Sequence, residues 1–176
     1  SQHGSKKDSA ALFRLLGLIY MQKSWYDKAL DNFEKSQQLF GESGDSSKQA
    51  KAFMNIGIVH DYLQNLPMAI SFYEKALSYF TRKQELPGIA DCKLNIAIVL
   101  TKQKKYQQAC EYLLSAAEIY SKNGNTTYLA AAYINLWHTN KKMGDYDRAI
   151  EYHNKALTLW QQADDQYHIS YYYMNM

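Results

Sequence analysis

A 40-residue spacing between equivalent small side chains constrains this chain more than any other feature. Ala29, Ala69, Ala109 and Ala149 follow one another at that interval. Around each alanine there is an aromatic residue or leucine three positions before, a bulky residue four after and a small residue seven after. The triplets are Tyr26, Phe33 and Ser36; Leu66, Tyr73 and Ala76; Tyr106, Leu113 and Ala116; and Tyr146, His153 and Ala156. A fixed period of this length over four copies predicts an array of structural repeats.

The composition indicates that the repeats are helical. Among 176 residues there are 8 Gly and 2 Pro, which are too few for the closely spaced turns of a β protein. The hydrophobic share of 47% and charged share of 21% are ordinary for a globular protein and argue against disorder. We therefore expect an all-α solenoid of four antiparallel helix pairs, in which each unit buries its apolar face against its neighbours.

Turn and capping signals divide the chain. We expect the first helix over about residues 9–22, turns at Gly41–Asp45, Asn123–Asn125 and Gly144, and Pro67 and Pro87 in the first turns of their helices. Residues 1–8 are expected to be a disordered lead-in or tag remnant. Residues 9–176 form a single predicted array, with repeats at about 10–49, 50–89, 90–129 and 130–169 and the start of a fifth first-position helix at 170–176. An array that ends inside such a helix leaves an apolar face uncovered, so we expect a fragment of a larger protein.

Charge, hydropathy and motifs exclude several classes of function. A net charge of +3 is too small to predict nucleic-acid binding, and the longest apolar run, Ile96–Leu100, is far too short to span a membrane. Cys92 and Cys110 lack the spacing of metal ligands, and the five His have no consistent carboxylate or thiol partner. We expect reduced thiols in a cytoplasmic protein, no metal or other cofactor, and no enzymatic activity.

Small residues also recur in the first helix of each pair. Twelve residues before Ala29, Ala69 and Ala109 there is again a small residue, namely Gly17, Gly57 and Ala97. Two antiparallel helices approach closely only where side chains are small. Trp137 occupies this position in the fourth repeat, and His153 occupies a core position there. Either the helix crossing is wider in that repeat or Trp137 turns outward.

These residues resemble the tetratricopeptide repeat. The matching segments are Leu16-Gly17-x-x-Tyr20 with Ala29, Phe33 and Ser36, and Ile56-Gly57-x-x-His60 with Ala69, Tyr73 and Ala76. The resemblance covers residues 10–169 and resumes after 169. A period of 40 rather than about 34 is similar to that of kinesin light chains, spindle-orientation scaffolds and bacterial peptide-pheromone receptors. The resemblance implies a right-handed superhelix whose concave groove is lined by the first helix of each pair.

Asparagine recurs at one position of these first helices, at Asn55, Asn95, Asn135 and Asn175, whereas the first repeat has Leu15. An amide can pair with both N–H and C=O groups of an extended peptide, and Asn is a mediocre helix former. The longer-repeat relatives use such residues to hold peptide backbone, and the resemblance extends this role to Asn55, Asn95 and Asn135. The alternative is that the amides bond to neighbouring helices and brace the stack.

Other positions on the same helices are candidate contacts for a ligand. The apolar ones suggest pockets for alternate side chains, and the basic ones favour an acidic or C-terminal partner, although a charge near a helix end is often only solvated. The candidates are Arg14, Leu18, Lys51, Met54, Ile58, Asp61, Leu94, Ile98, Ile134, His138, Lys141 and Lys142. Arg14 with Leu18 and Asp91 with Asn95 do not match the carboxylate clamp of chaperone-binding relatives.

The sequence therefore predicts a non-catalytic module that binds a protein or peptide partner, as part of a regulatory or signalling protein. A narrower version is the sensory part of a bacterial regulator that responds to a short peptide, which rests on analogy of fold. The alternative is a structural array that self-associates through its uncapped C-terminal helix and has no peptide ligand. Regulation of an enzyme through the convex face is neither supported nor excluded.

Overall fold

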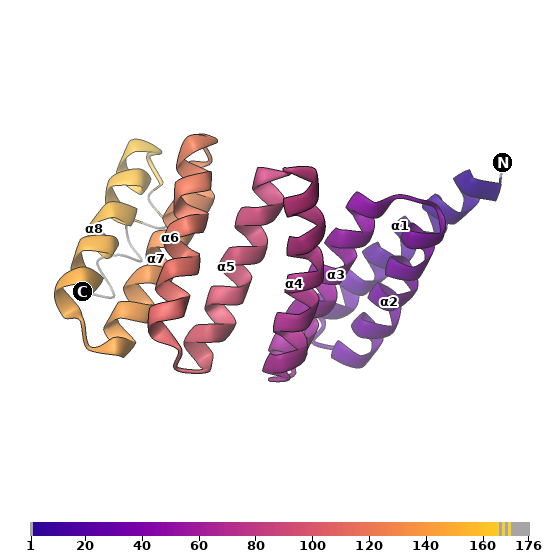
Figure 1. Ribbon diagram of the computed structural model, residues 1–176, viewed down its shortest axis with the longest axis horizontal. Coiled ribbons are helices and arrows are strands. Elements are labelled where there is room, and N and C mark those ends of the chain that lie inside the picture. Colours follow the sequence, from indigo (N-terminus) through magenta and orange to yellow (C-terminus); the bar gives the residue numbers. More distant parts are fainter. Residues whose placement is uncertain (1, 166, 168, 170–176) are drawn as a thin grey trace. The chain divides into compact units, whose positions relative to one another are not determined.

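The computed structural model describes residues 2–165, 167 and 169, with side chains described from residue 6 onward. This part of the chain contains eight α-helices and no strand (Figure 1), which confirms the all-α prediction. The predicted helical residues 170–176 lie outside the described residues. The helices are α1 (Gln2–Gln22), α2 (Tyr26–Glu42), α3 (Ser46–Tyr62), α4 (Leu66–Lys83), α5 (Leu86–Lys102), α6 (Tyr106–Lys122), α7 (Thr126–Met143) and α8 (Tyr146–Gln162).

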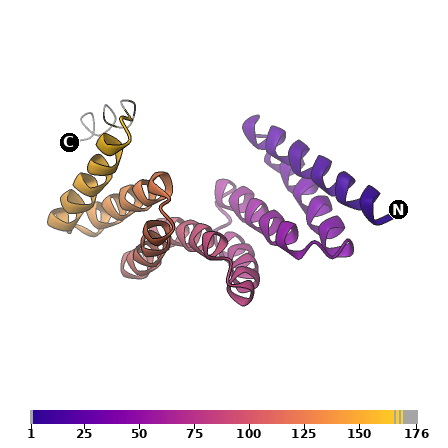
Figure 2. The ribbon, with the colours of Figure 1, turned by 90° about the horizontal axis from the view of Figure 1, so that it is seen from above.

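The helices belong to two compact units, residues 1–95 and 96–176, and the boundary between them falls within α5. In the first unit α1 packs against α2, α2 against α3 and α3 against α4; in the second, α6 packs against α7 and α7 against α8. Neighbouring helices within each unit run in opposite directions (Figure 2). The helix α1 begins before the expected start at about Ser9, and Lys6 in its first turns pairs with Glu42 of α2 at 2.8 Å.

Each helix from α2 to α8 is preceded by a turn whose geometry repeats with the 40-residue period. Residues with positive φ stand at Ser24, Gln64, Lys104 and Gly144 within the helix pairs, and at Gly44, Gln84, Gly124 and Asp164 between them. The residue after each donates its N–H to a carbonyl five positions earlier, as Asn65 does to His60 at 2.8 Å and Asp145 to Asn140 at 3.0 Å. This is the hydrogen bond that closes a helix around a left-handed residue. The regular turns keep the same residue positions facing their neighbours in each pair.

Small residues allow the paired helices to touch where the sequence predicts. A Cβ atom added to Gly17 would lie 2.5 Å from the ring of Phe33, and one added to Gly57 would lie 2.6 Å from the ring of Tyr73. These distances leave no room for a side chain larger than hydrogen. The ring from one helix therefore lies directly on the backbone of its partner in the first two pairs.

Trp137 is buried, with 5% of its surface exposed, so the alternative that it turns outward is wrong. Its ring stacks on that of His153, with centroids 4.4 Å apart and planes inclined by 11°. His153 occupies the position of Phe33 and Tyr73, and its smaller imidazole leaves space that the indole fills. The fourth pair therefore reverses the distribution of volume between its two helices.

The two thiols are in different environments. Cys92 is completely buried in a core cluster with Ala50, Ala76 and Phe80, and burial raises its pKa to about 12. Cys110 is half-buried, and burial also raises its pKa. Both are free, and a raised pKa leaves little reactive thiolate at neutral pH.

Candidate ligand-binding face

The three predicted amides lie at the border between core and solvent. Asn55 on α3 and Asn95 on α5 belong to the first unit, and Asn135 on α7 belongs to the second. Each is half-buried, while the residue that follows it is buried in the core in every case: Ile56, Ile96 and Leu136. The helical period thus places each amide next to the core without enclosing it.

On α3 the predicted residues share one face of the helix. Lys51, Met54, Asn55 and Ile58 are spaced three or four residues apart, which brings them onto one side. Lys51 is exposed and the other three are half-buried. Met54 also packs against the core cluster that includes Cys92 of α5, so this face continues from α3 towards α5 inside the first unit.

The predicted residues on α5 and α1 are partly accessible. Leu94 and Ile98 are half-buried on successive turns of α5, and Ile98 belongs to the second unit. On α1, Arg14 is half-buried and Leu18 is 37% exposed. Leu15, at the register of the amides, is 48% exposed. The face of α1 is therefore apolar where α3, α5 and α7 carry an amide.

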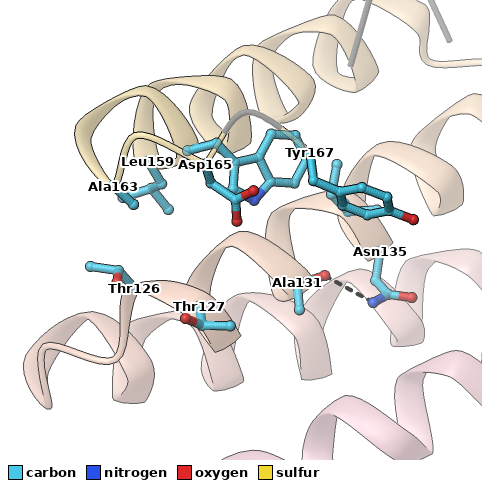
Figure 3. A pocket seen from close by; sticks show the side chains of 10 residues that line it. Thr126, Thr127, Ala131, Asn135, Leu159, Ala163, Asp165 and Tyr167 are labelled. Atoms are coloured by element: carbon cyan, nitrogen blue, oxygen red, sulfur yellow. Dashed lines mark hydrogen bonds between the residues drawn. The ribbon is translucent and has the colours of Figure 1, made fainter. Parts of the chain in front are cut away.

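On α7 the Asn135 side chain makes a hydrogen bond within its own helix. Its Nδ2 donates to the backbone oxygen of Ala131 at 2.9 Å (Figure 3). The amide has one further N–H that can donate a hydrogen bond and an Oδ1 that can accept hydrogen bonds. This bond orients the amide along the helix, and the group is half-buried rather than enclosed.

Beyond Asn135 the same helix carries basic and aromatic groups. His138, Lys141 and Lys142 are exposed, and the Lys141 Nζ lies 5.3 Å from the centre of the Trp137 ring. Partial loss of hydration at the imidazole lowers the pKa of His138, although the residue as a whole is exposed, and the positive charges of Lys142 and Lys141 lower it further. The imidazole is therefore neutral at pH 7, and the two lysines supply the charge of this region.

A cavity of about 390 Å³ lies beside Asn135. The helix α7 contributes Thr127, Ala131, Ile134 and Asn135 to its lining, so two of the predicted site residues are found there. The opposite wall consists of side chains from the end of α8 and the residues after it, namely Leu159, Trp160, Asp165 and Tyr167 (Figure 3). The other predicted contacts do not line this cavity.

Sequence reasoning missed the residues of the opposite wall and the small residue on α7. Ala131 stands at the register of Ala11, Lys51 and Asp91, so a short side chain takes the place of the charged ones of the second and third repeats. Trp160 stands at the register of Phe40, Phe80 and Tyr120, all buried. Alignment of the four repeats column by column would have shown both, because the period needs no gap.

The described residues contain no group of three or more His, Cys, Asp or Glu side chains arranged to hold a metal ion. None of their helices combines the length and apolar character needed to cross a lipid bilayer.

The regular pairs of antiparallel helices define a helical-repeat protein. The sequence pattern of the tetratricopeptide repeat matches residues 8–82 and 89–162, and the chain belongs to that family. No curated protein matches the sequence closely enough to count as a relative.

Solved structures share the fold at low sequence identity. BtubC (BKLC) from P. vanneervenii has a TM-score of 0.79 and 20% identity, over 90% of this chain and 65% of that one. Aspartyl phosphate phosphatase F from Bacillus subtilis has a TM-score of 0.88 and 20% identity, over 95% and 44%. A Rap protein complexed with Competence and Sporulation Factor has a TM-score of 0.79 and 20% identity, over 90% and 44%. The chain thus spans less than two thirds of the length of these proteins.

Proposed function

We propose that the chain is a non-catalytic interaction module that binds an extended peptide or partner segment. Binding uses the faces of α3, α5 and α7 that carry Asn55, Asn95 and Asn135, which the family resemblance implies line a concave groove. The observation that carries this proposal is the shared state of the three amides. They occupy one register position, and each is half-buried beside a buried core residue.

Amides in that state suit the recognition of a peptide backbone. A buried amide would be committed to neighbouring helices, and a fully exposed one would hold a ligand only with a large loss of side-chain entropy. The hydrogen bond from Asn135 to Ala131 orients one of them in advance, which reduces that loss. The Rap protein that was solved with Competence and Sporulation Factor adds support from a protein of the same fold.

The charged residues on these helices favour a partner with acidic groups or a free carboxylate. Lys51, Lys141 and Lys142 are exposed, and Arg14 is half-buried on α1. Exposed charges contribute mainly to the rate of association and to specificity, and their effect decreases with added salt. We expect the affinity itself to depend on the amides and the apolar residues between them.

The test is binding of peptides selected from a displayed library of random extended sequences. We expect replacement of Asn55, Asn95 and Asn135 by Ala to weaken binding by two orders of magnitude or more, because each lost hydrogen bond costs about 1 kcal/mol. Affinity is measured by fluorescence anisotropy, and circular dichroism checks the helix content.

Asn32→Ala is the matched control. The Asn32 side chain makes the same kind of bond to its own helix, from Nδ2 to the Lys28 oxygen at 2.7 Å, but it lies on α2, the second helix of its pair. It should leave the affinity unchanged. If the triple variant binds the selected peptides as tightly as the native protein does, the amides do not form the site.

A further inference from the structure

The cavity beside Asn135 has one wall made by α7 and another made by the end of α8 with Asp165 and Tyr167. We infer that it receives one apolar, non-acidic side chain of the bound segment, which anchors that segment next to the Asn135 amide. The inference rests on the proposed function and adds the chemical class of one ligand residue.

A small side chain on α7 leaves room for the cavity. Ala131 has the register position of Lys51 and Asp91 in two other repeats and of Ala11 in the first, and its methyl group takes up less space beside Asn135 than either charged side chain would. The resulting space of about 390 Å³ falls near the lower end of the range of about 300–1,000 Å³ typical of ligand pockets. It is large enough for one bulky side chain and too small for a folded element of a partner.

The lining selects for an apolar guest. Ile134, Leu159 and Trp160 give the cavity an apolar floor, and Trp160 itself is 7% exposed, with its ring packed against Ala130 and Ala156. Asp165 contributes a carboxylate to the lining, which disfavours an acidic side chain. An aliphatic or aromatic side chain is therefore the best match.

The position of the amide explains why the guest would belong to a peptide rather than to a free small molecule. Ala131, Ile134 and Asn135 lie on one face of α7, since they are separated by three and four residues. The Tyr167 ring, which is 77% exposed, lies on the Asn135 side of the cavity (Figure 3). A peptide backbone held by the amide would place an adjacent side chain over the opening, because side chains in an extended chain alternate in direction.

The experiment uses the peptides selected for the proposed function and replaces their residues one at a time by Ala. One apolar position should dominate, with a loss of about 10- to 100-fold in affinity when its side chain is removed. In the protein, Ala131→Phe fills the cavity without removing Asn135 or the backbone oxygen to which it donates. This variant should weaken the native peptide to about the same level as removal of the anchor, and it should be insensitive to that removal.

Thr127→Phe, which narrows the cavity from the other end of its α7 wall, should act in the same direction. Thr158→Phe is the matched control: Thr158 is exposed on α8 outside the cavity, so both peptides should bind this variant as they bind the native protein. Asn135→Ala should weaken the native and the anchor-less peptides by equal factors, because it removes a backbone contact.

The outcomes separate the two proposals. If peptides bind, depend on the three amides and still bind Ala131→Phe with unchanged affinity, this inference is wrong and the proposed function stands. An acidic residue at the dominant position would also overturn it. If no peptide depends on the amides, the proposed function fails before the cavity is tested.

Discussion

The α3–α4 pair and the α7–α8 pair have the same register but solve the contact between their helices in opposite ways. In the α3–α4 pair Gly57 has no side chain, and a Cβ atom added to it would lie 2.6 Å from the Tyr73 ring. In the α7–α8 pair the larger residue, Trp137, is on the first helix and the smaller ring, that of His153, is on the second helix. Their ring centroids are 4.4 Å apart. The crossing point therefore does not require a small residue on the first helix of every pair, because the α7–α8 pair accommodates Trp137 opposite a ring smaller than that of Tyr73.

The same two pairs also differ on the face that we propose for binding. Lys51 and Asn55 on α3 correspond to Ala131 and Asn135 on α7. Both pairs have the amide, whereas the long side chain one turn before it on α3 is replaced by a methyl group on α7, and a cavity lies beside the amide of the α7–α8 pair. Core and binding face can therefore vary independently while the helix positions stay in register.

The largest effect on stability should come from removal of the Trp137 side chain at the crossing point of α7 and α8. Trp137→Ala leaves a space that His153 cannot fill, and we expect a loss of about 3–5 kcal/mol in the free energy of unfolding. Part of the loss is the ring stacking itself, about 0.5–1.5 kcal/mol. Urea unfolding followed by circular dichroism measures the change.

Trp25→Ala is the control in the first unit. Trp25 is 47% exposed at a turn and stacks on Tyr20 with centroids 5.8 Å apart. It should cost no more than about 1.5 kcal/mol, since it loses an aromatic contact but creates no cavity. Equal losses for the two tryptophans would contradict the exchange of volumes at the crossing point.

A smaller loss of stability is expected at acid pH, and it should arise mainly in the α7–α8 pair. Burial lowers the pKa of His153, and His138 and Lys141 lower it further. Burial also lowers the pKa of His60 in the first unit, but there the carboxylate of Glu34 acts in the opposite direction. Between the lowered folded pKa and the unfolded value of about 6.5, the unfolded state binds more protons, so stability is complete above about pH 6.5 and decreases as the pH falls.

The melting temperature at about pH 7.5 and pH 5.5 measures this dependence. His153→Phe keeps a ring against Trp137 without a titrating group, and it should reduce the difference in melting temperature between the two pH values. His60→Phe should reduce that difference less. A larger effect of His60→Phe would show that the charges around His153 do not act as described.

Much of the fold was predictable because it depends on a period. The 40-residue spacing of Ala29, Ala69, Ala109 and Ala149 predicts where helices pair, and the structure confirms the helices and the close contacts at Gly17 and Gly57. Trp137 could not be placed in advance, because its direction depends on the size of the ring opposite. A sequence pattern at one position does not give the size of the side chain that packs against it.

The candidate site was less predictable, and for a different reason. Asn135 and Ile134 could be found because they are present at a repeating position. The cavity beside them depends on what Ala131 lacks, and on side chains such as Trp160 and Tyr167 that come from another helix and the chain after it. A pattern within one helix identifies the residues that point outward but not the space that two elements enclose.

The smallest effect on stability should come from the turns inside the α3–α4 and α7–α8 pairs, where different residues adopt a left-handed backbone conformation. Gln64 and Gly144 occupy the same register position, with φ of 58° and 89°. A left-handed conformation is costly for an L-residue with a side chain and free of that cost for Gly. The Gln64 side chain returns little, since its Nε2 donates to the Asp61 oxygen at a long 3.3 Å. We therefore expect Gln64→Gly to stabilise the protein by about 0.5–1 kcal/mol, and Gly144→Ala to destabilise it by about 1 kcal/mol.

Thermal unfolding of the two variants measures this contrast directly. Apart from Gly144 and its two chain neighbours, none of the described atoms lies within 4 Å of the position that a Cβ would take at Gly144, so the loss at that site reports the local backbone and not a clash with another part of the chain. The two substitutions should thus shift the melting temperature in opposite directions. If both variants shift it in the same direction, the left-handed residues are not what limits the stability of these turns, and the contrast between the pairs is confined to their crossing points.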